Sequence, residues 1–493
     1  MDVECSLCVL KFGGTSVGSG ERIRRVAQIV AQAASKALNE GAPFPVVVVS
    51  AMSGITDQLL RIAHFARRGE SLEWRRELAA LRDRHLQAAE KAVHDGMRLA
   101  ELRATLEEAL AGLEREAAGC EGYVDAVAAW GERLSVLLLA AAINDLSLPG
   151  VAAAPVREEV IVTGEPQGHA PSEPGAVIGA EPLEEETRAR AQQLLLPLLQ
   201  GRGRTVPVAP GFIGRTPAGL VTTLGRNGSD YSATVIGAAI DCCEVAIYTD
   251  VDGVMSADPR IVANARLLPA LTYAEAARLS WFGAKVLHPR TLIPVAQRNI
   301  PVRVRNTFRP QMHGTLIGPE GKYHSGATAI TVRRRLALVT VESTNMFGAP
   351  ENAGQVFALA ARVGAAPVAI CSSSGHHLSF MVEEQAAASV VSLLQHDLGH
   401  WRVSCRPGLA ACACLGSGFT SDPMSPARAI SALARERIPV ISQGASEQGI
   451  ILIVEDGDSE RALRCLHRDL IAPVIPLVRH PAHEKRLEAL KAR

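Results

Sequence analysis

The segment from residue 222 to residue 231 combines a cation, a hydroxyl and a carboxylate on one glycine-containing turn. Arg226, Ser229 and Asp230 stand there, directly before an apolar, alanine-rich run over residues 232–240 that predicts a helix. A helix N-terminus reached through glycines lets backbone N–H groups approach an anion, and the added charges suit a small charged substrate. A second interpretation stays open, in which Ser229 and Asp230 only cap the helix.

A second glycine turn, near the N-terminus, has the composition of a phosphate-binding turn. Residues 7–12 form a short apolar run that predicts a strand, Gly13 and Gly14 follow it, and residues 22–38 have the spacing of an amphipathic helix. This order can aim backbone amides at an anion, and Lys11 adds a cation at the strand end. It is not a Walker A loop, because the lysine precedes the glycines.

Hydroxyl and acidic side chains follow two further apolar runs that predict strands. Ser50 and Thr56 come after a valine-rich run, and Thr249 and Asp250 come at the end of another apolar run. Because open α/β sheets bind ligands at the carboxyl ends of their strands, these side chains are candidates for one site. Acidic residues before a glycine can hold a nucleotide directly or through Mg²⁺, although Asp-rich turns without a ligand are also common.

Three more charged residues are candidates for binding. Glu132 opens a predicted helix, where its carboxylate either binds a ligand or only favours the helix dipole. Arg260 follows the acidic turn and has the length to reach a phosphate. Lys285 is a lone lysine among apolar neighbours, a setting that favours a phosphate partner.

The elements that must position these residues alternate between strand and helix through the first two thirds of the chain. This alternation predicts an α/β fold, with a mainly parallel sheet covered by helices on both faces. Residues 57–118 have helical spacing and many charges, so we expect a helical insertion without chemistry there. Residues 302–306 predict the last strand of this domain, which we place at residues 1–320.

The composition is that of a globular protein with several domains. The chain has 493 residues, of which 47% are hydrophobic and 21% charged, and Lys+Arg and Asp+Glu both total 51. A zero net charge gives no sign of a nucleic-acid or anionic-membrane partner. We expect no secretory leader, no membrane span and a cytoplasmic location. Of the ten scattered cysteines, we interpret Cys5, Cys8, Cys242, Cys243, Cys371, Cys412 and Cys414 as core thiols rather than metal ligands.

An internal repeat appears beyond residue 335 when the sequence is shifted by 72 residues. Residues 380–383 (FMVE) then align with residues 452–455 (LIVE), and the Pro-Val pair at 367–368 aligns with the one at 439–440. Each copy has the element pattern of a ferredoxin-like βαββαβ module. We expect module 1 at residues 336–405, module 2 at residues 406–479 and a charged tail at 480–493, although two generic βαβ units can also resemble each other by chance.

Four segments in a fixed order give residues 7 to about 320 a resemblance to the aspartate kinases, within the amino-acid kinase family. They are KFGGTS at 11–16, LGRNGSDY at 224–231, TDVDG at 249–253 with DPR at 258–260, and FGAKVLHP at 282–289. The helical insertion makes this part similar to the kinase half of bifunctional aspartate kinase/homoserine dehydrogenases. The resemblance implies transfer of the ATP γ-phosphate, with Mg²⁺, to the β-carboxylate of L-aspartate, the entry to lysine, threonine and methionine synthesis.

The resemblance also assigns roles by position. It implies that Lys11 steadies the transferring phosphoryl group and that Asp230 is its catalytic partner. The implied substrate residues are Ser50, Thr56, Glu132, Arg226 and Ser229, and the implied ATP residues are Gly13, Gly14, Thr249, Asp250, Arg260 and Lys285. One position departs from the pattern, because Met255 stands where many relatives have an aromatic residue.

The repeated modules resemble the paired ACT domains that bind an end-product amino acid and join subunits. The implied effector residues are Asn345, Met346, Phe347, Gly348, Ser373 and Ser374. Ala369 and Gly375 stand where lysine-inhibited relatives commonly have acidic residues, so threonine or an altered effector is an alternative to lysine. We expect a homodimer or homotetramer joined through these modules. Two alternatives remain, an amino-acid kinase with another carboxylate acceptor and a catalytically silent amino-acid sensor.

Overall fold

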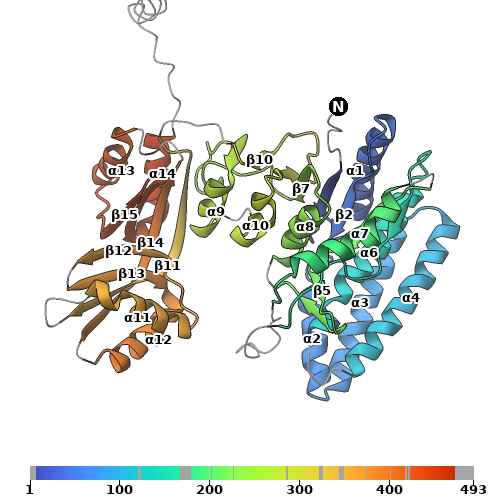
Figure 1. Cartoon of the computed structure of the whole chain (residues 1–493), viewed down its shortest axis with the longest axis horizontal. Coiled ribbons are helices and arrows are strands. Elements are labelled where there is room, and N and C mark those ends of the chain that lie inside the picture. The colour runs from blue at the N-terminus through green and yellow to red at the C-terminus, as the bar shows by residue number, and fades with distance from the viewer. Residues whose placement is uncertain are drawn as a thin grey trace, which may run out of the picture. The chain divides into compact units, whose positions relative to one another are not determined.

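The computed structural model describes most of the chain and divides it into two compact units. The described residues are 7–119, 124–166, 179–200, 203–225, 227–284, 287–320, 326–343, 349–374, 376–399, 401–416, 419 and 422–471. The first unit comprises Met1–Val254, Leu267–Tyr273 and Val286–Gly321, and the second comprises Met255–Arg266, Ala274–Lys285 and Lys322–Arg493. Figure 1 shows the elements of both.

An eight-stranded sheet forms the centre of the first unit. Its strand order is β3 (Ala153–Pro155), β4 (Val206–Pro210), β2 (Val46–Val49), β1 (Cys8–Phe12), β7 (Glu244–Thr249), β9 (Val302–Asn306), β10 (Thr315–Gly318) and β8 (Ala270–Thr272). Every neighbouring pair is parallel except β9 and β10. The mainly parallel sheet is as predicted, but β9 is not the last strand, because β10 returns beside it as an antiparallel strand.

Helices cover both faces of this sheet. All four valines of β2 are fully buried, and because successive side chains of a strand point to opposite faces, neither face is open to solvent. One packed group contains α1 (Gly20–Asn39), α2 (Ile55–Arg67), α3 (Ser71–Ala92), α4 (Gly96–Ala118) and α6 (Trp130–Asp145), with the short α5 (Asp125–Ala128) before α6. Another contains α7 (Glu184–Leu199), α8 (Gly228–Ala239) and α10 (Pro289–Gln297). A short hairpin of β5 (Ile213–Arg215) and β6 (Val221–Thr223) lies outside the main sheet.

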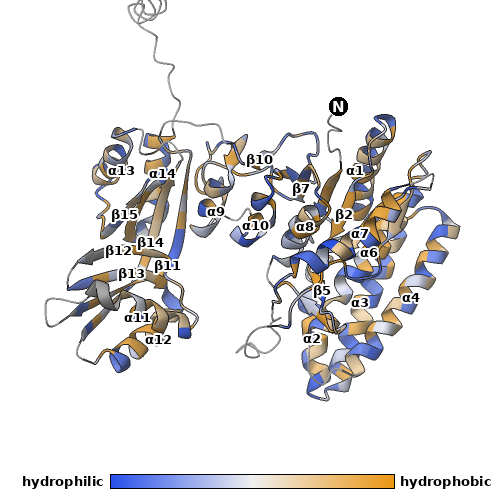
Figure 2. Ribbon diagram, viewed as in Figure 1, coloured by the Kyte–Doolittle hydropathy of each residue, from blue (hydrophilic) through white to orange (hydrophobic). Residues whose placement is uncertain are grey.

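The predicted helical insertion consists of the three helices α2, α3 and α4. Figure 2 shows that hydrophilic and hydrophobic residues alternate along α3 and α4, as expected for helices with one solvated face. Among the described residues, the stretch Asp125–Asp145 is long and apolar enough to cross a membrane, but 72% of its apolar window is buried inside the fold, which is typical of a core helix.

The second unit is built on a six-stranded antiparallel sheet. Its order is β12 (Ala369–Ser374), β13 (His377–Glu383), β11 (Ala329–Ser343), β14 (Trp401–Leu415), β16 (Gly449–Glu455) and β15 (Ser442–Ser446). Its helices are α9 (Tyr273–Trp281), α11 (Ala349–Arg362), α12 (Glu384–Asp397), α13 (Met424–Arg435) and α14 (Ser459–Leu470). Strands β13 and β16 begin and end 72 residues apart, which confirms the repeat found in the sequence.

The two ferredoxin-like modules exchange strands. The second half of β11 pairs with β13 and with the first half of β14, which completes module 1. The first half of β11, residues 329–333, pairs with residues 411–415 of β14, and these residues also pair with β16 in module 2. Each long strand therefore serves both modules, with a register shift between Arg333 and Leu338 where β11 passes from one to the other.

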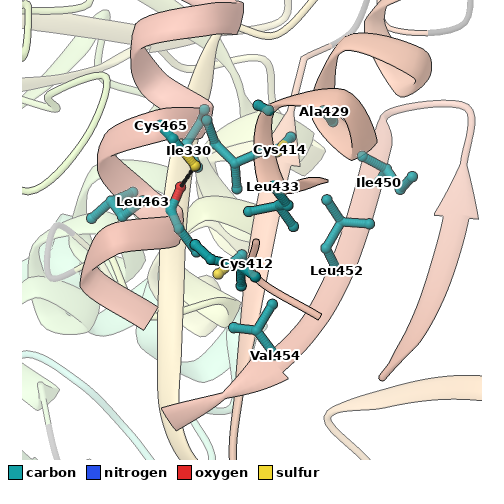
Figure 3. Close-up of a cluster of buried hydrophobic side chains, with 14 of the residues drawn as sticks. Ile330, Cys412, Cys414, Ala429, Leu433, Ile450, Leu452, Val454, Leu463 and Cys465 are labelled. Atoms are coloured by element: carbon teal, nitrogen blue, oxygen red, sulfur yellow. Dashed lines mark hydrogen bonds between the residues drawn. The ribbon is translucent and has the colours of Figure 1, made fainter. Parts of the chain in front are cut away.

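The core of module 2 shows the consequence of this exchange. Ile330, from the first half of β11, packs in one buried cluster with Cys412, Cys414 and Leu452 (Figure 3). Ala257 and Val262 join the same cluster, together with others of the segment Met255–Arg266. Residues 255–266 and 274–285 thus belong to the second unit, although their sequence positions fall inside the predicted 1–320 domain. Cys412 and Cys414 are core thiols as predicted, and burial raises the pKa of Cys412 to about 12.

Candidate active site

Lys11 and Asp230 form the centre of the site in the first unit. The Lys11 Nζ lies 2.5 Å from the Asp230 Oδ1, and the two side chains are 8% and 19% exposed. Lys11 stands near the carboxyl end of β1, between Val48 of β2 and Ile247 of β7, so the lysine is fixed within the centre of the sheet. A cation this buried needs an anionic partner, which the first turn of α8 supplies.

The turn before α8 differs from a simple capped turn. The residue at the cap position is Asn227, in the left-handed region with φ 59°, and no side chain of the described residues caps the helix. Asp230 instead contacts Lys11, so the interpretation in which Ser229 and Asp230 only cap the helix is wrong. The first turn of α8 thus lies close to Lys11, and a helix N-terminus beside a cation favours an anion.

Two glycines allow the chain to approach closely around Lys11. A Cβ on Gly14 would stand 2.9 Å from the carbonyl oxygen of Ala51, so a side chain there would force β1 and β2 apart at the edge that carries the site. A Cβ on Gly13 would stand 3.2 Å from the Lys11 Nζ. Gly13 therefore keeps the space beside the ammonium group open, and Gly14 allows the close approach to the chain after β2, which fits the glycine turn predicted from the sequence.

Glu132 presents a buried carboxylate with one unused oxygen. The side chain is 2% exposed, and its Oε1 accepts a hydrogen bond of 2.9 Å from the Ala51 N–H at the end of β2. Its Oε2 accepts no hydrogen bond from any described residue. Burial raises the pKa of Glu132 to about 8, against a smaller lowering by the Ala51 N–H and by Lys11. A buried, unpaired acceptor of this kind is suited to a cationic ligand group.

The hydroxyl residues predicted for the substrate lie just after β2, at the start of α2 and at the start of α8. Ser50 is buried directly after β2, and its N–H donates to the Phe12 carbonyl at the end of β1. Thr56 is half-buried in the first turn of α2, and Ser229 is half-buried in the first turn of α8. The structure therefore places these three on the turns that follow β2 and β6.

The predicted nucleotide residues Thr249 and Asp250 stand at the carboxyl end of β7. Thr249 is the last residue of the strand, and Asp250 follows it. The Thr249 hydroxyl donates to the Asp250 Oδ1 at 3.2 Å, and Asp250 is exposed. The turn that follows is held by Asp252, whose carboxylate accepts from the Asn306 amide at 2.7 Å and pairs with Arg309 at 2.6 Å. Asp250 is thus left as an accessible carboxylate beside the phosphate-binding turn.

The structure does not gather all the residues predicted for the site. Arg260 belongs to the second unit, where its guanidinium pairs with Asp258 at 2.6 Å. Ser373 and Ser374 lie on β12, opposite Leu378 and His377, and Ser374 is exposed. The predicted residues that lie outside the described part of the chain are Arg226, Lys285, Asn345, Met346, Phe347 and Gly348.

Sequence reasoning missed some residues that build the site. Ser16 and Thr307 bridge the glycine turn to the end of β9 through a hydroxyl–hydroxyl contact of 2.6 Å, and the Thr307 N–H donates to the Thr249 carbonyl. Asn306 and Thr307 follow a predicted strand, so the rule that polar residues at strand ends form the site could have identified them. Within the described residues, no three His, Cys, Asp or Glu side chains gather as a metal site.

Known proteins resemble this chain over most of its length. Residues 6–306 match the amino acid kinase family, and residues 413–470 match the ACT domain. The chain is 35% identical over 482 residues to "Bifunctional aspartokinase/homoserine dehydrogenase 2, chloroplastic" of Zea mays, covering 93% of this chain and 50% of that protein. It therefore spans about half the length of the bifunctional relatives that it matches.

A curated sequence and a solved structure, both from Escherichia coli, cover the chain more evenly. "Lysine-sensitive aspartokinase 3" of strain K12 is 30% identical over 471 residues, covering 94% of this chain and 99% of that protein. The crystal structure of E. coli aspartokinase III in complex with aspartate and ADP matches with a TM-score of 0.75 at 29% identity, covering 94% of this chain and all of that one. With the sheet, the Lys11–Asp230 pair and the paired modules, these matches show that the chain belongs to the aspartokinases of the amino acid kinase family.

Proposed function

We propose that this protein is an aspartate kinase, which transfers the γ-phosphoryl group of ATP to the β-carboxylate of L-aspartate and yields 4-phospho-L-aspartate and ADP. The observation that carries the proposal is the contact between Lys11 and Asp230 beside the glycine turn, with the unpaired carboxylate oxygen of Glu132 on the same side of the fold. The bound aspartate and ADP in the E. coli relative support it.

The chemistry requires little beyond positioning and charge neutralisation. A carboxylate is already ionised at neutral pH, so the acceptor needs no general base, and the barrier is lowered by in-line placement and by cations on the phosphoryl oxygens. Lys11 supplies such a cation, and Asp230 holds its ammonium group in place. ATP arrives as its Mg²⁺ complex, with Gly13 and Gly14 leaving room for the phosphates and Thr249 and Asp250 on the nucleotide side.

Substrate recognition divides between two charged groups. Arg226 is proposed to grip a carboxylate of aspartate, because a guanidinium can form two parallel hydrogen bonds with it. The unpaired oxygen of Glu132 is proposed to receive the α-ammonium group. Ser50, Thr56 and Ser229 complete the site with hydroxyl groups. Lys285 and Arg260 remain proposed ATP residues, and Arg260 would have to exchange its present partner Asp258 for phosphate.

We further propose that residues 1–320 catalyse the reaction and that the modules at 336–405 and 406–479 regulate it, followed by the charged tail at 480–493. The proposed effector residues are Asn345, Met346, Phe347, Gly348, Ser373 and Ser374, and the effector is lysine or threonine. The name of the lysine-sensitive E. coli relative supports lysine. The proposed assembly is a homodimer or homotetramer through the modules, and the proposed location is the cytoplasm.

An acceptor panel tests this function. The enzyme is incubated with ATP, Mg²⁺ and hydroxylamine, and with L-aspartate, L-glutamate or no acceptor. Hydroxylamine converts an acyl phosphate to a hydroxamate, which is then detected as its coloured complex with ferric ion. We expect hydroxamate with aspartate only, and less of it when lysine or threonine is added. Equal hydroxamate formation with glutamate would show that aspartate is not the specific acceptor. No hydroxamate with either acceptor, with and without each effector, would favour a catalytically silent amino-acid sensor.

A further inference from the structure

Two buried carboxylates lie on one face of the helical stretch formed by α5 and α6. Asp125 is 1% exposed and Glu132 is 2% exposed. The backbone stays helical between them, because the Ala129 N–H donates to the Asp125 carbonyl and the Arg133 N–H donates to the Ala129 carbonyl. Seven residues are about two helical turns, so both side chains project from the same face.

The Asp125 carboxylate binds the end of β6. Its Oδ2 accepts one hydrogen bond of 3.0 Å from the Thr223 N–H and another of 2.9 Å from the Thr223 hydroxyl. Thr223 is fully buried and is the last residue of β6. A buried carboxylate that holds both donors of one residue fixes that residue in position and orientation, because either donor would be left unpaired without it.

Thr223 in turn fixes the turn that leads to Ser229 and Asp230. The next residue, Leu224, is fully buried and its N–H donates to the Phe212 carbonyl. The chain then reverses through Gly225 at φ 75° and Asn227 at φ 59°, and α8 begins at Gly228. Ser229 is the sixth residue after Thr223, so a displaced strand end would move the substrate side of the turn with it.

We infer that Asp125 is a positioning residue for aspartate, acting through Thr223 on the turn that leads to Ser229. This inference rests on the proposed function. A single helical stretch thereby sets both sides of the aspartate site, because Glu132 contacts the end of β2 and Asp125 contacts the end of β6. The proposed ATP residues of the glycine turn and of the end of β7 lie on other elements, so we expect ATP binding to change little when Asp125 is replaced.

The chain offers a matched control on the same helix. Asp145, at the other end of α6, also has a nearly buried carboxylate, which accepts from Arg24 at 2.6 Å and from the N–H groups of His94 and Asp95. Its partners belong to α1 and to the loop before α4, away from the substrate turn. Thr222 is the control for Thr223, because its hydroxyl contacts the Thr163 hydroxyl at 2.8 Å instead of Asp125.

The test is steady-state kinetics of the full-length enzyme with aspartate and ATP varied separately. For Asp125→Ala we expect the KM for aspartate to rise about tenfold or more while the KM for ATP changes less than about twofold. Asp125→Asn, which keeps an oxygen acceptor, should restore part of the loss, and Thr223→Val should raise the aspartate KM by about threefold to tenfold. Asp145→Ala and Thr222→Val should lower the thermal midpoint without this selective change.

Several results would overturn the inference. One is an Asp125→Ala enzyme whose two KM values change no more than those of Asp145→Ala. If Asp125→Ala fails to fold, the Thr223→Val variant decides alone. Equal KM values for aspartate in Thr223→Val and Thr222→Val would then reject the positioning role of the Asp125–Thr223 contact. A wild-type enzyme without aspartate-dependent hydroxamate would instead reject the proposed function, so the two failures are distinguishable.

Discussion

The ammonium nitrogen of Lys11 lies 2.5 Å from the Oδ1 of Asp230, and the two residues come from a central strand and from a helix more than two hundred residues later. The pair is mostly shielded from solvent, so each charge depends on the other. When a triphosphate binds, the Lys11 ammonium group can donate hydrogen bonds to the phosphoryl oxygens while its contact with Asp230 keeps the ammonium group in place. We propose that this lysine stabilises the transferring phosphoryl group.

Replacement of Lys11 should therefore reduce turnover more than binding. For Lys11→Met we expect kcat to fall by about a hundredfold to a thousandfold, with the KM for aspartate changed less than about threefold. Lys11→Arg keeps the charge but not the geometry, so its kcat should lie between those of the wild type and Lys11→Met. The measurement is the initial rate at saturating ATP, and a Lys11→Met enzyme with near-normal kcat would contradict the role.

Aspartate binding should depend on pH through Glu132. Because burial raises the pKa of Glu132 to about 8, the carboxyl is mostly protonated at pH 7 in the empty site. Only the ionised form attracts an ammonium group, so the KM for aspartate should fall about tenfold between pH 7 and pH 9. Glu132→Gln should raise that KM and remove the pH dependence. A wild-type KM that is flat over this range would show that Glu132 does not bind the substrate ammonium.

Acid should destabilise the first unit through His85. This residue of α3 is fully buried, its Nδ1 contacts the Leu81 carbonyl, and burial lowers its pKa to about 4. The unfolded chain then binds the proton at higher pH than the folded one, so the free energy of unfolding should fall by up to about 3 kcal/mol between pH 6.5 and pH 4. His85→Leu should weaken the dependence of the thermal unfolding midpoint on pH, whereas the exposed control His94→Gln should leave this dependence unchanged. Parallel curves for all three proteins would contradict this cause.

The strand exchange in the second unit predicts a long-range effect of Ile330. Truncation to alanine leaves a cavity among residues of module 2, although Ile330 precedes module 1 in the chain. We expect Ile330→Ala to cost about 2–4 kcal/mol and to speed hydrogen exchange of β14 and β16. Ile370→Ala, at a position that is 55% exposed, is the control and should cost little. Faster exchange confined to module 1 would contradict the shared core.

Sequence reasoning predicted the features that depend on local chemistry. The strand with Lys11, the helix with Asp230, the parallel sheet and the 72-residue repeat all follow from hydrophobic spacing and glycine turns, and each is present. The partnership of Lys11 and Asp230 follows from the resemblance to the aspartate kinases, and the structure brings the two side chains into contact. Their catalytic roles remain proposals.

The missing features depend on contacts between distant residues. Asp125 binds Thr223 across 98 positions, and a lone aspartate in an alanine-rich stretch carries no pattern that identifies its partner. Likewise, a strand of 15 residues does not reveal that its two halves pair in different modules. Nothing in the sequence indicated that residues 255–266 pack in the second unit, because that packing depends on contacts with β11, β14 and β16.

The most direct test of the central claim follows one oxygen atom. L-Aspartate labelled with ¹⁸O in the β-carboxylate is incubated with ATP, Mg²⁺, hydroxylamine and either wild-type enzyme or Lys11→Met. Attack of that carboxylate on the γ-phosphorus makes the labelled oxygen the bridge of the acyl phosphate, and hydroxylamine then releases phosphate that keeps it. The account predicts phosphate with one ¹⁸O from the wild type and at least about a hundredfold less from Lys11→Met. Unlabelled phosphate, or equal labelling by both enzymes, would contradict it.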